Sequence, residues 1–208
     1  MKIGKDNIEQ LVADTLGTVV KQVEEQGFPL SSEKTLVFKF MWELGRIVSD
    51  DDLKFDFEYA AYEKLNSSDT SDRFLDLLVW TDEDFKVAFE FKLPKRGLTG
   101  SPQTNTKPKI YRDIARLKYL VDTAQTGIRA GFFICAVNED AYLNNTGRAD
   151  LTYSVAHMHK ASVTEVGGLS LPTPLTFIWN GIKLEDYKDK YVCAGRFAWL
   201  EPVIIHGG

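Results

Sequence analysis

The sequence predicts an α/β fold whose core runs in the order helix, three strands, helix, strand. Three observations predict it: apolar side chains at helical spacing over 32–48, two apolar runs around a polar turn at 81–84, and an almost wholly apolar run at 129–137. With 208 residues, of which 44% are apolar, the chain is long enough to bury a sizeable core. We therefore expect one domain over 1–208, with its core in about 32–137.

Two helices are predicted before the first strand. Over 5–26 apolar residues recur at steps of three and four, as on the buried side of an amphipathic helix, and a glycine and a proline directly afterwards end the pattern. The second helix covers 32–48, with Ser31 or Ser32 as its N-cap. Both apolar stripes are interpreted as core packing.

The predicted strands follow the second helix. The run 53–65 is the first, and Phe74–Trp80 and Val87–Leu93 form a hairpin around the turn Thr81-Asp82-Glu83-Asp84. The run 129–137 suits a central strand buried on both faces.

The hairpin contains three charges that apolar strands normally exclude: Asp76, Glu90 and Lys92. Alternation puts Glu90 and Lys92 on one face of their strand. If the turn has an odd number of residues, or a bulge shifts the register, Asp76 lies directly across from Glu90, with Cβ atoms about 4.5–5.5 Å apart. Two carboxylates at that distance repel each other unless a divalent cation lies between them, so a metal site is the first candidate.

The spacing of these charges resembles a known motif. Asp76, thirteen residues and then Glu90-Phe91-Lys92 resemble the PD-(D/E)XK superfamily of metal-dependent nucleases, although Leu75 stands at the position of the motif's proline. The resemblance extends over about 32–137. It implies a restriction-endonuclease-like core, with a mixed central β-sheet flanked by helices, to which this chain adds an N-terminal helix and C-terminal β-structure.

The resemblance also implies roles for the motif residues. Asp76 and Glu90 would hold Mg²⁺, for which Mn²⁺ could substitute, and the backbone carbonyl of Phe91 would complete the site. Lys92 would orient the attacking water and stabilise the charge that develops on the phosphate.

An additional glutamate often lies on the first core helix of the resembled family, where it helps to bind metal. Glu33, in the first turn, is the preferred match, and Glu43 is the alternative on the same helix. Glu58, inside the first strand, is held in reserve. Each has an ordinary interpretation as well: Glu33 complements the helix dipole, and the other two are solvated polar positions.

Beyond the hairpin the charge changes sign. Residues 92–118 carry eight basic side chains and one acidic, a local charge of +7, so the rest of the chain carries −12 against a total of −5. Such a basic segment suits the phosphates of nucleic acid; DNA is the expected partner, with RNA left open. Five side chains are expected to contact it: Lys95, Arg96, Lys107, Lys109 and Arg112. Gly97–Pro108, rich in Gly, Ser, Thr, Asn and Pro, is predicted to be a mobile loop.

A further helix is predicted over Ile110–Ala124. Asp113 and Arg116 lie on it at ion-pair spacing. Similar Asp-x-x-Arg-Leu helices follow the catalytic strand in several nuclease-like families, so the resemblance extends to this helix.

The C-terminal third predicts more β-structure. Leu175–Trp179 and Ile182–Tyr187 flank Asn180-Gly181, a dipeptide typical of two-residue hairpin turns, and another strand is predicted over 191–200. These strands form either a separate sheet or an extension of the main one.

The remaining composition bears on compartment and assembly. The chain has no run of 18 apolar residues and no signal-peptide pattern, so we expect a cytoplasmic protein without membrane association. Cys135 and Cys193 lie in apolar runs and are expected to be reduced, and no Cys/His cluster has zinc spacing. A homodimer is left open.

These residues together indicate Mg²⁺-dependent hydrolysis of phosphodiester bonds by an endonuclease acting on DNA. One alternative is a catalytically inactive protein that keeps the nuclease fold as a binding or scaffolding module, with Asp76 and Lys92 as a cross-strand ion pair. Another is a hydrolase that acts on nucleotides or other phosphates with the same metal site.

Overall fold

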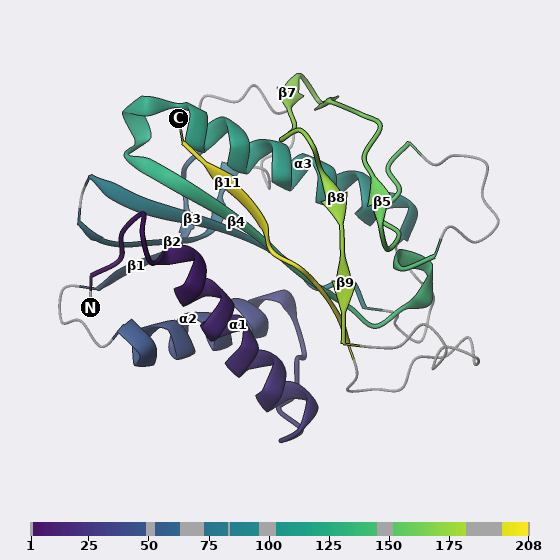
Figure 1. The fold of residues 1–208 in the computed structure, drawn as a ribbon, viewed down its shortest axis with the longest axis horizontal. Coiled ribbons are helices and arrows are strands. Elements are labelled where there is room, and N and C mark those ends of the chain that lie inside the picture. Colours follow the sequence, from purple (N-terminus) through teal and green to yellow (C-terminus); the bar gives the residue numbers. More distant parts are fainter. Residues whose placement is uncertain are drawn as a thin grey trace.

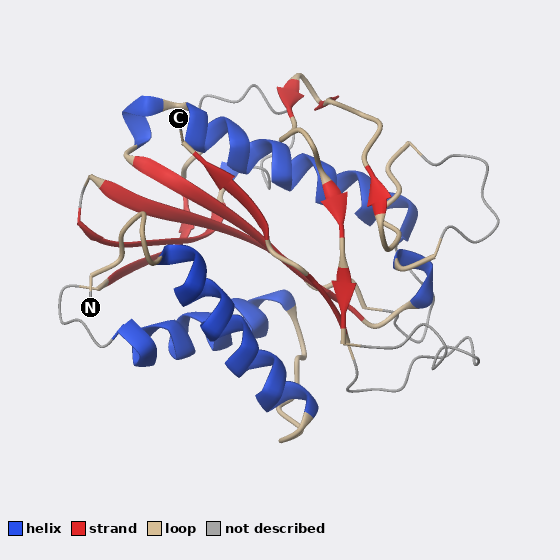
Figure 2. Cartoon of the chain, viewed as in Figure 1, coloured by secondary structure: helices blue, strands red, loops and turns tan. Residues whose placement is uncertain are grey.

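The protein has a central mixed β-sheet with helices on both faces, as the predicted α/β class requires. Helices α1 (Ile8–Glu24) and α2 (Glu33–Val48) cover one face, and α3 (Gln103–Asp122) covers the other (Figures 1 and 2). This arrangement comes from a computed structural model, which describes residues 2–48, 53–62, 73–82, 84–95, 103–144, 152–181 and 197–207.

Both predicted N-terminal helices are confirmed to within a few residues. Each buries one apolar stripe against the sheet, as the periodicity of three and four residues predicts. The predicted serine cap is also present, because Ser32 Oγ accepts a hydrogen bond from the Thr35 amide at 3.2 Å, just before α2 begins.

The main sheet has the strand order β1-β2-β3-β4-β10-β9, and β11 also pairs with β4. All of its pairs are antiparallel except β3 with β4. The strands are β1 (Lys54–Tyr59), β2 (Leu75–Asp82), β3 (Phe85–Lys92), β4 (Ile128–Val137), β9 (Trp179–Asn180), β10 (Ala198–Leu200) and β11 (Val203–His206).

The parallel pair β3–β4 is joined across the sheet by α3, because parallel neighbours need a crossover connection. Gly131 on β4 lies close under this helix: a Cβ atom added there would stand 3.2 Å from Val121 Cγ2. β4 itself is buried over nearly its whole length, which confirms the predicted central strand.

Two predicted boundaries were wrong. Helix α3 begins at Gln103, so the segment from there to Pro108 is helical and not a loop; residues 97–102 lie outside the described residues. The sequence did not indicate a helix over 103–108, because this segment is polar and contains a proline. Burial of Ile110 and Tyr111 further along α3 holds the helix in place. The first strand was predicted over 53–65, but β1 ends at Tyr59 and residues 60–62 are not part of it. Glu58 has a φ of 50°, and the chain turns directly afterwards.

The C-terminal third shows both predicted outcomes, because β9, β10 and β11 extend the main sheet while shorter strands form separate two-stranded sheets. The predicted strand Leu175–Trp179 is divided between the two: β8 (Thr176–Phe177) pairs with β5 (His159–Lys160), and β9 pairs with β10. The hairpin partner 182–187 lies outside the described residues. Five shorter elements complete the described fold, and Figure 1 labels two of them, β5 and β7. They are η2 (Ala124–Thr126), η3 (Asp140–Tyr142), β5 (His159–Lys160), β6 (Glu165–Val166) and β7 (Leu169–Ser170).

Among the described residues, no helix combines the length and the apolar character that crossing a membrane would need.

Candidate functional site

The β2–β3 register brings the two motif carboxylates together. Leu77 pairs with Phe89, and the antiparallel register continued by one residue puts Asp76 opposite Glu90. The condition stated from the sequence is met, since five residues separate the paired Trp80 and Lys86 and the register then shifts at a bulge. The predicted opposition of the two carboxylates is therefore confirmed.

Asp76 lies where the β2–β3 ladder ends. Its Oδ2 accepts a hydrogen bond from the Phe91 amide at 2.7 Å, in place of a strand partner. Burial raises the pKa of Asp76; the Phe91 amide, Lys92 and a hydrogen bond with the Glu90 carboxyl oppose that rise without cancelling it. The register and this electrostatic coupling place the two carboxyl groups as near neighbours on one face of the hairpin.

Glu90 is the most enclosed of the acidic groups, with 2% of its surface exposed. Tyr62 Oη donates to Glu90 Oε1 at 2.9 Å, and Arg116 Nη2 lies 3.4 Å from the same oxygen. Burial raises the pKa of Glu90 well above its usual range, and the neighbouring charges of Asp76 and Asp113 raise it further.

The ammonium group of Lys92 is held by two carboxylates. Lys92 Nζ lies 2.9 Å from Asp113 Oδ2 and 3.5 Å from Glu33 Oε1, and it donates to the Phe91 carbonyl at 3.4 Å. Burial alone would lower the pKa of Lys92, but Asp113, Glu33 and the two motif carboxylates outweigh burial and raise it. The cross-strand pair with Asp76 that the scaffolding alternative expected is replaced by these two partners.

Of the three candidate helper glutamates, the structure brings Glu33 to the site. Its Oε2 accepts a hydrogen bond from the Leu93 amide at 3.3 Å, and burial raises its pKa. Glu43 lies elsewhere, in contact with Gln22 and Lys39. Glu58 pairs with Lys34 on the surface. The preference for Glu33 agrees with this geometry.

Sequence reasoning missed three members of the site. The pair Asp113–Arg116 forms at 3.1 Å, as its spacing predicts, but its contacts with Lys92 and Glu90 were not foreseen. Tyr62 was not considered, and its ring lies under the Arg116 guanidinium at 4.0 Å. One signal was available, because residues 113 and 116 share the apolar, buried side of α3.

We call this group of charges the buried charge cluster: Glu33, Asp76, Glu90, Asp113, Lys92 and Arg116. Four carboxylates face two cations, so the fully ionised cluster carries −2. It is least buried at Asp76, Lys92 and Glu33. Within the described residues no three His, Cys, Asp or Glu side chains are grouped closely enough to hold a metal ion, so the available donor pair is Asp76 with Glu90.

Of the basic side chains expected to contact phosphate, three lie on α3, namely Lys107, Lys109 and Arg112, and Lys95 follows β3. Lys95 donates to the backbone carbonyls of Leu30 and Ser31 and so holds the α1–α2 connection. Lys107 stands 5.8 Å from the centre of the Tyr142 ring. Lys109 is exposed and Arg112 is half-buried. Arg96 lies outside the described residues.

Comparison of the chain with protein-family models, with curated proteins and with solved structures gives no match.

Proposed function

We propose that this chain is a metal-dependent phosphodiesterase that cleaves nucleic acid, in the first place an endonuclease acting on DNA. One observation carries the proposal: Asp76 and Glu90 lie opposite each other across β2 and β3, on the face of β3 that also carries Lys92. A restriction-endonuclease-like core is part of the same proposal, supported by the order α2-β1-β2-β3-α3-β4 and by the parallel pair β3–β4.

The donor set fits a hard divalent cation. Asp76, Glu90 and the Phe91 carbonyl offer only oxygen, the ligand that Mg²⁺ and Mn²⁺ prefer. The cluster has an excess of two negative charges, and burial already disfavours the ionised form of both motif carboxyls. A bound cation would supply charge neutralisation and a water of lowered pKa.

The protein's own residues would then position the reaction. Tyr62 and Arg116 fix one oxygen of Glu90, which sets the direction of the carboxylate. Lys92, kept protonated by its carboxylate neighbours, can orient a water and donate to a phosphate oxygen as charge accumulates there. Glu33, with 37% of its side chain exposed, stands at the accessible edge and can accept a proton or a metal-bound water.

The test is a cleavage assay with supercoiled DNA, linear duplex, single-stranded DNA and RNA, in Mg²⁺, in Mn²⁺ and in EDTA. We expect metal-dependent cleavage of at least one substrate, and its loss in Asp76→Asn and Glu90→Gln. The matched control is Glu165→Gln, which changes an exposed glutamate on β6. Metal-independent cleavage, or equal activity in all three variants, would refute the proposal.

A scaffolding function has one specific observation in its favour. Lys92 and Arg116 each already contact two carboxylates, so part of the negative charge is balanced without a metal. Calorimetric titration with Mn²⁺ separates the two functions. A catalytic cluster binds the ion and loses affinity in Asp76→Asn, whereas a purely structural network takes up none.

A further inference from the structure

The exposed side of α2 carries an unusual sequence of side chains. At successive four-residue steps it presents Lys34, Phe38, Trp42 and Arg46, which we call the α2 stripe. Phe38 and Trp42 are 54% and 55% exposed, and their rings stack with centroids 6.1 Å apart and planes at 30°. The outer side of an amphipathic helix is normally polar, so two stacked aromatic rings between two cations indicate a binding surface.

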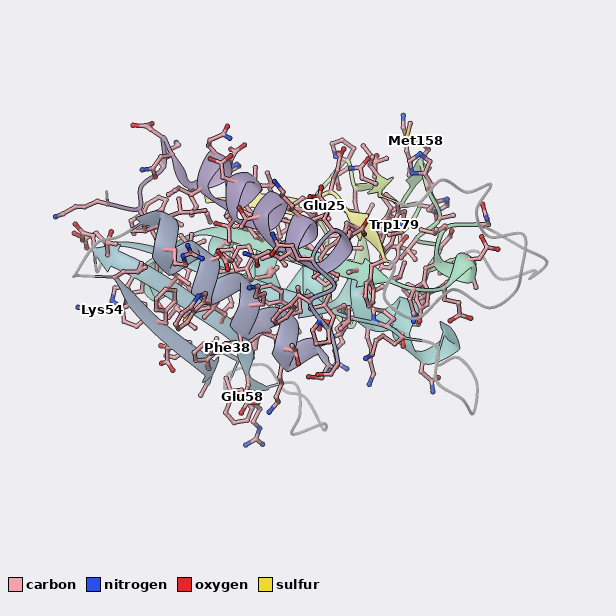
Figure 3. All side chains as sticks on the ribbon, turned by 90° about the horizontal axis from the view of Figure 1, so that it is seen from below. Glu25, Phe38, Lys54, Glu58, Met158 and Trp179 are labelled. Carbon is pink, nitrogen blue, oxygen red and sulfur yellow. The ribbon has the colours of Figure 1, made fainter. Side chains whose placement is uncertain are left out.

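Further exposed aromatic side chains occur on β1 and just before β2. Seven large apolar side chains are exposed in the described part of the chain, and five of them are aromatic: Phe38 and Trp42 of α2, Phe57 and Tyr59 of β1, and Phe74, the residue before β2. The ion pair between Lys34 and Glu58, at 2.7 Å, ties α2 to β1. In Figure 3 Met158 lies at the opposite side of the molecule from the labelled Phe38 and Glu58.

The α2 stripe starts beside the buried charge cluster. Lys34 directly follows Glu33, whose Oε1 lies 3.5 Å from Lys92 Nζ. Phe74 is two residues from Asp76, and its carbonyl accepts a hydrogen bond from Arg116 at 2.8 Å. A ligand lying along the stripe would therefore have one end beside the proposed cleavage site.

The charge of the stripe is opposite to that of the cluster. The two cations of the α2 stripe, Lys34 and Arg46, give it +2, and each contacts one carboxylate, Glu58 at 2.7 Å and Glu43 at 3.6 Å. The Lys34–Glu58 pair is largely exposed, with 84% and 63% of the two side chains accessible. Exposed pairs of this kind are weak, so a phosphate can replace the carboxylate.

We propose that the α2 stripe binds unpaired nucleotides of the substrate, with bases stacked on Phe38 and Trp42 and phosphates at Lys34 and Arg46. The two cations are twelve residues apart, which is about 18 Å along a helix. Aromatic platforms between cations are how proteins hold single strands, whereas paired bases in a duplex offer no free face for stacking. The inference rests on the proposed function and gives its substrate class: single-stranded nucleic acid, or duplex with an unpaired segment.

The first test is fluorescence anisotropy of the full chain with a labelled single strand and with the matching blunt duplex, both in EDTA so that nothing is cleaved. Replacing both rings, Phe38→Ala with Trp42→Ala, should weaken single-strand binding at least about tenfold and duplex binding less than about twofold. Trp42→Phe keeps a stacking surface and should retain most of the affinity. The control is Met158→Ala, an equally exposed apolar side chain far from the stripe.

The cations are tested by salt dependence. For single strands the slope of log K against log salt is about −0.7 per phosphate contact, so Lys34→Gln with Arg46→Gln should flatten it by roughly 1.4. An unchanged slope, or an aromatic double variant that binds single strands as well as wild type does, would overturn the inference. So would a wild-type dimer that becomes monomeric in the aromatic variant without any effect on single-strand binding, because the occupant would then be a second copy.

Failure of this inference is distinguishable from failure of the proposed function. If Asp76→Asn abolishes cleavage while the aromatic double variant binds single strands normally, the catalytic proposal stands and the stripe proposal falls. If no substrate is cleaved under any metal condition, but single-strand binding depends on the two rings, the stripe proposal stands as binding alone.

Discussion

The two faces of β3 carry opposite kinds of side chain on the same backbone. Toward α1 and α2, Phe89 and Phe91 are fully buried and pack around Phe40, with ring centroids 5.2 and 5.5 Å away. Toward α3, Glu90 and Lys92 enter the buried charge cluster. Because successive side chains alternate, one backbone presents an aromatic core and an ionic site only one residue apart.

The comparison separates stability from function. Burial of aromatic rings stabilises the fold by itself. For buried charges, the free energy gained by pairing does little more than offset the hydration free energy lost. The aromatic face therefore accounts for why β3 is a central strand, but the charged face does not. A cluster of six charges beside an apolar core is expected where chemistry or binding requires it.

The largest effect on stability is expected on the aromatic face. Phe89→Ala should lower the free energy of unfolding by about 3–5 kcal/mol, because the ring is fully buried and its loss leaves a cavity. Urea unfolding measures this change. Cleavage per folded molecule should stay near the wild-type value at low temperature. A folded Phe89→Ala protein without activity would mean that the two faces are not independent.

A comparable effect, but on rate, is expected on the charged face. Lys92→Met keeps the aliphatic stem and removes the charge, so cleavage should fall about 10²- to 10³-fold, as when one donor to a developing negative charge is lost. Lys86→Met is the matched control, since it changes a lysine on the same face of the same strand, near Trp80. Equal rates for both variants would assign Lys92 a structural role.

An intermediate effect is expected from pH. The pKa of Glu90 is raised in the folded protein, so between about pH 4.5 and that raised value the unfolded chain has lost a proton that the folded chain keeps. The folded state is therefore destabilised as pH rises, by at most about 1.4 kcal/mol per pH unit for one such group. In EDTA, Glu90→Gln should flatten this decline, measured by urea unfolding from pH 5 to 8, and Glu165→Gln should not. A parallel decline in all three proteins would place the titrating groups elsewhere.

The sequence correctly predicted the features that depend on local patterns of apolar and polar residues. Strand alternation put Glu90 and Lys92 on one face, and the spacing from Asp76 anticipated the register that the hairpin adopts. The element order through β4 followed from apolar periodicity. These features are set within short stretches, where the side-chain period and the turn leave few alternatives.

What the sequence missed depends on contacts between distant segments. Tyr62 reaches Glu90 across 28 residues of sequence, a contact that no local pattern indicates. The contact between Asp113 and Lys92 requires knowing how α3 crosses the sheet, which periodicity does not give. The start of α3 was missed for a related reason: its first turns are polar, and packing further along the helix holds them in place.

The smallest effect on stability and cleavage is expected for a substitution on the exposed side of α3. The same helix carries an aspartate on its buried side, so the two can be compared. Asp122 pairs with Lys118 at 2.6 Å, with 50% and 27% of the two side chains exposed, so Asp122→Asn should change stability by less than about 0.5 kcal/mol and leave cleavage unchanged. Asp113→Asn removes the same charge from the buried side, where Lys92 Nζ is 2.9 Å away.

Because Asp113 raises the pKa of Lys92, its loss should move the alkaline limb of the rate–pH profile to lower pH, and Asp122→Asn should not move it. Because the pKa of Lys92 is raised above its usual value, rate–pH profiles of both variants must extend above pH 10 to measure the difference. If the two profiles superimpose on that of the wild type, Asp113 does not act through Lys92, and the link between α3 and the charged face of β3 is one of packing alone.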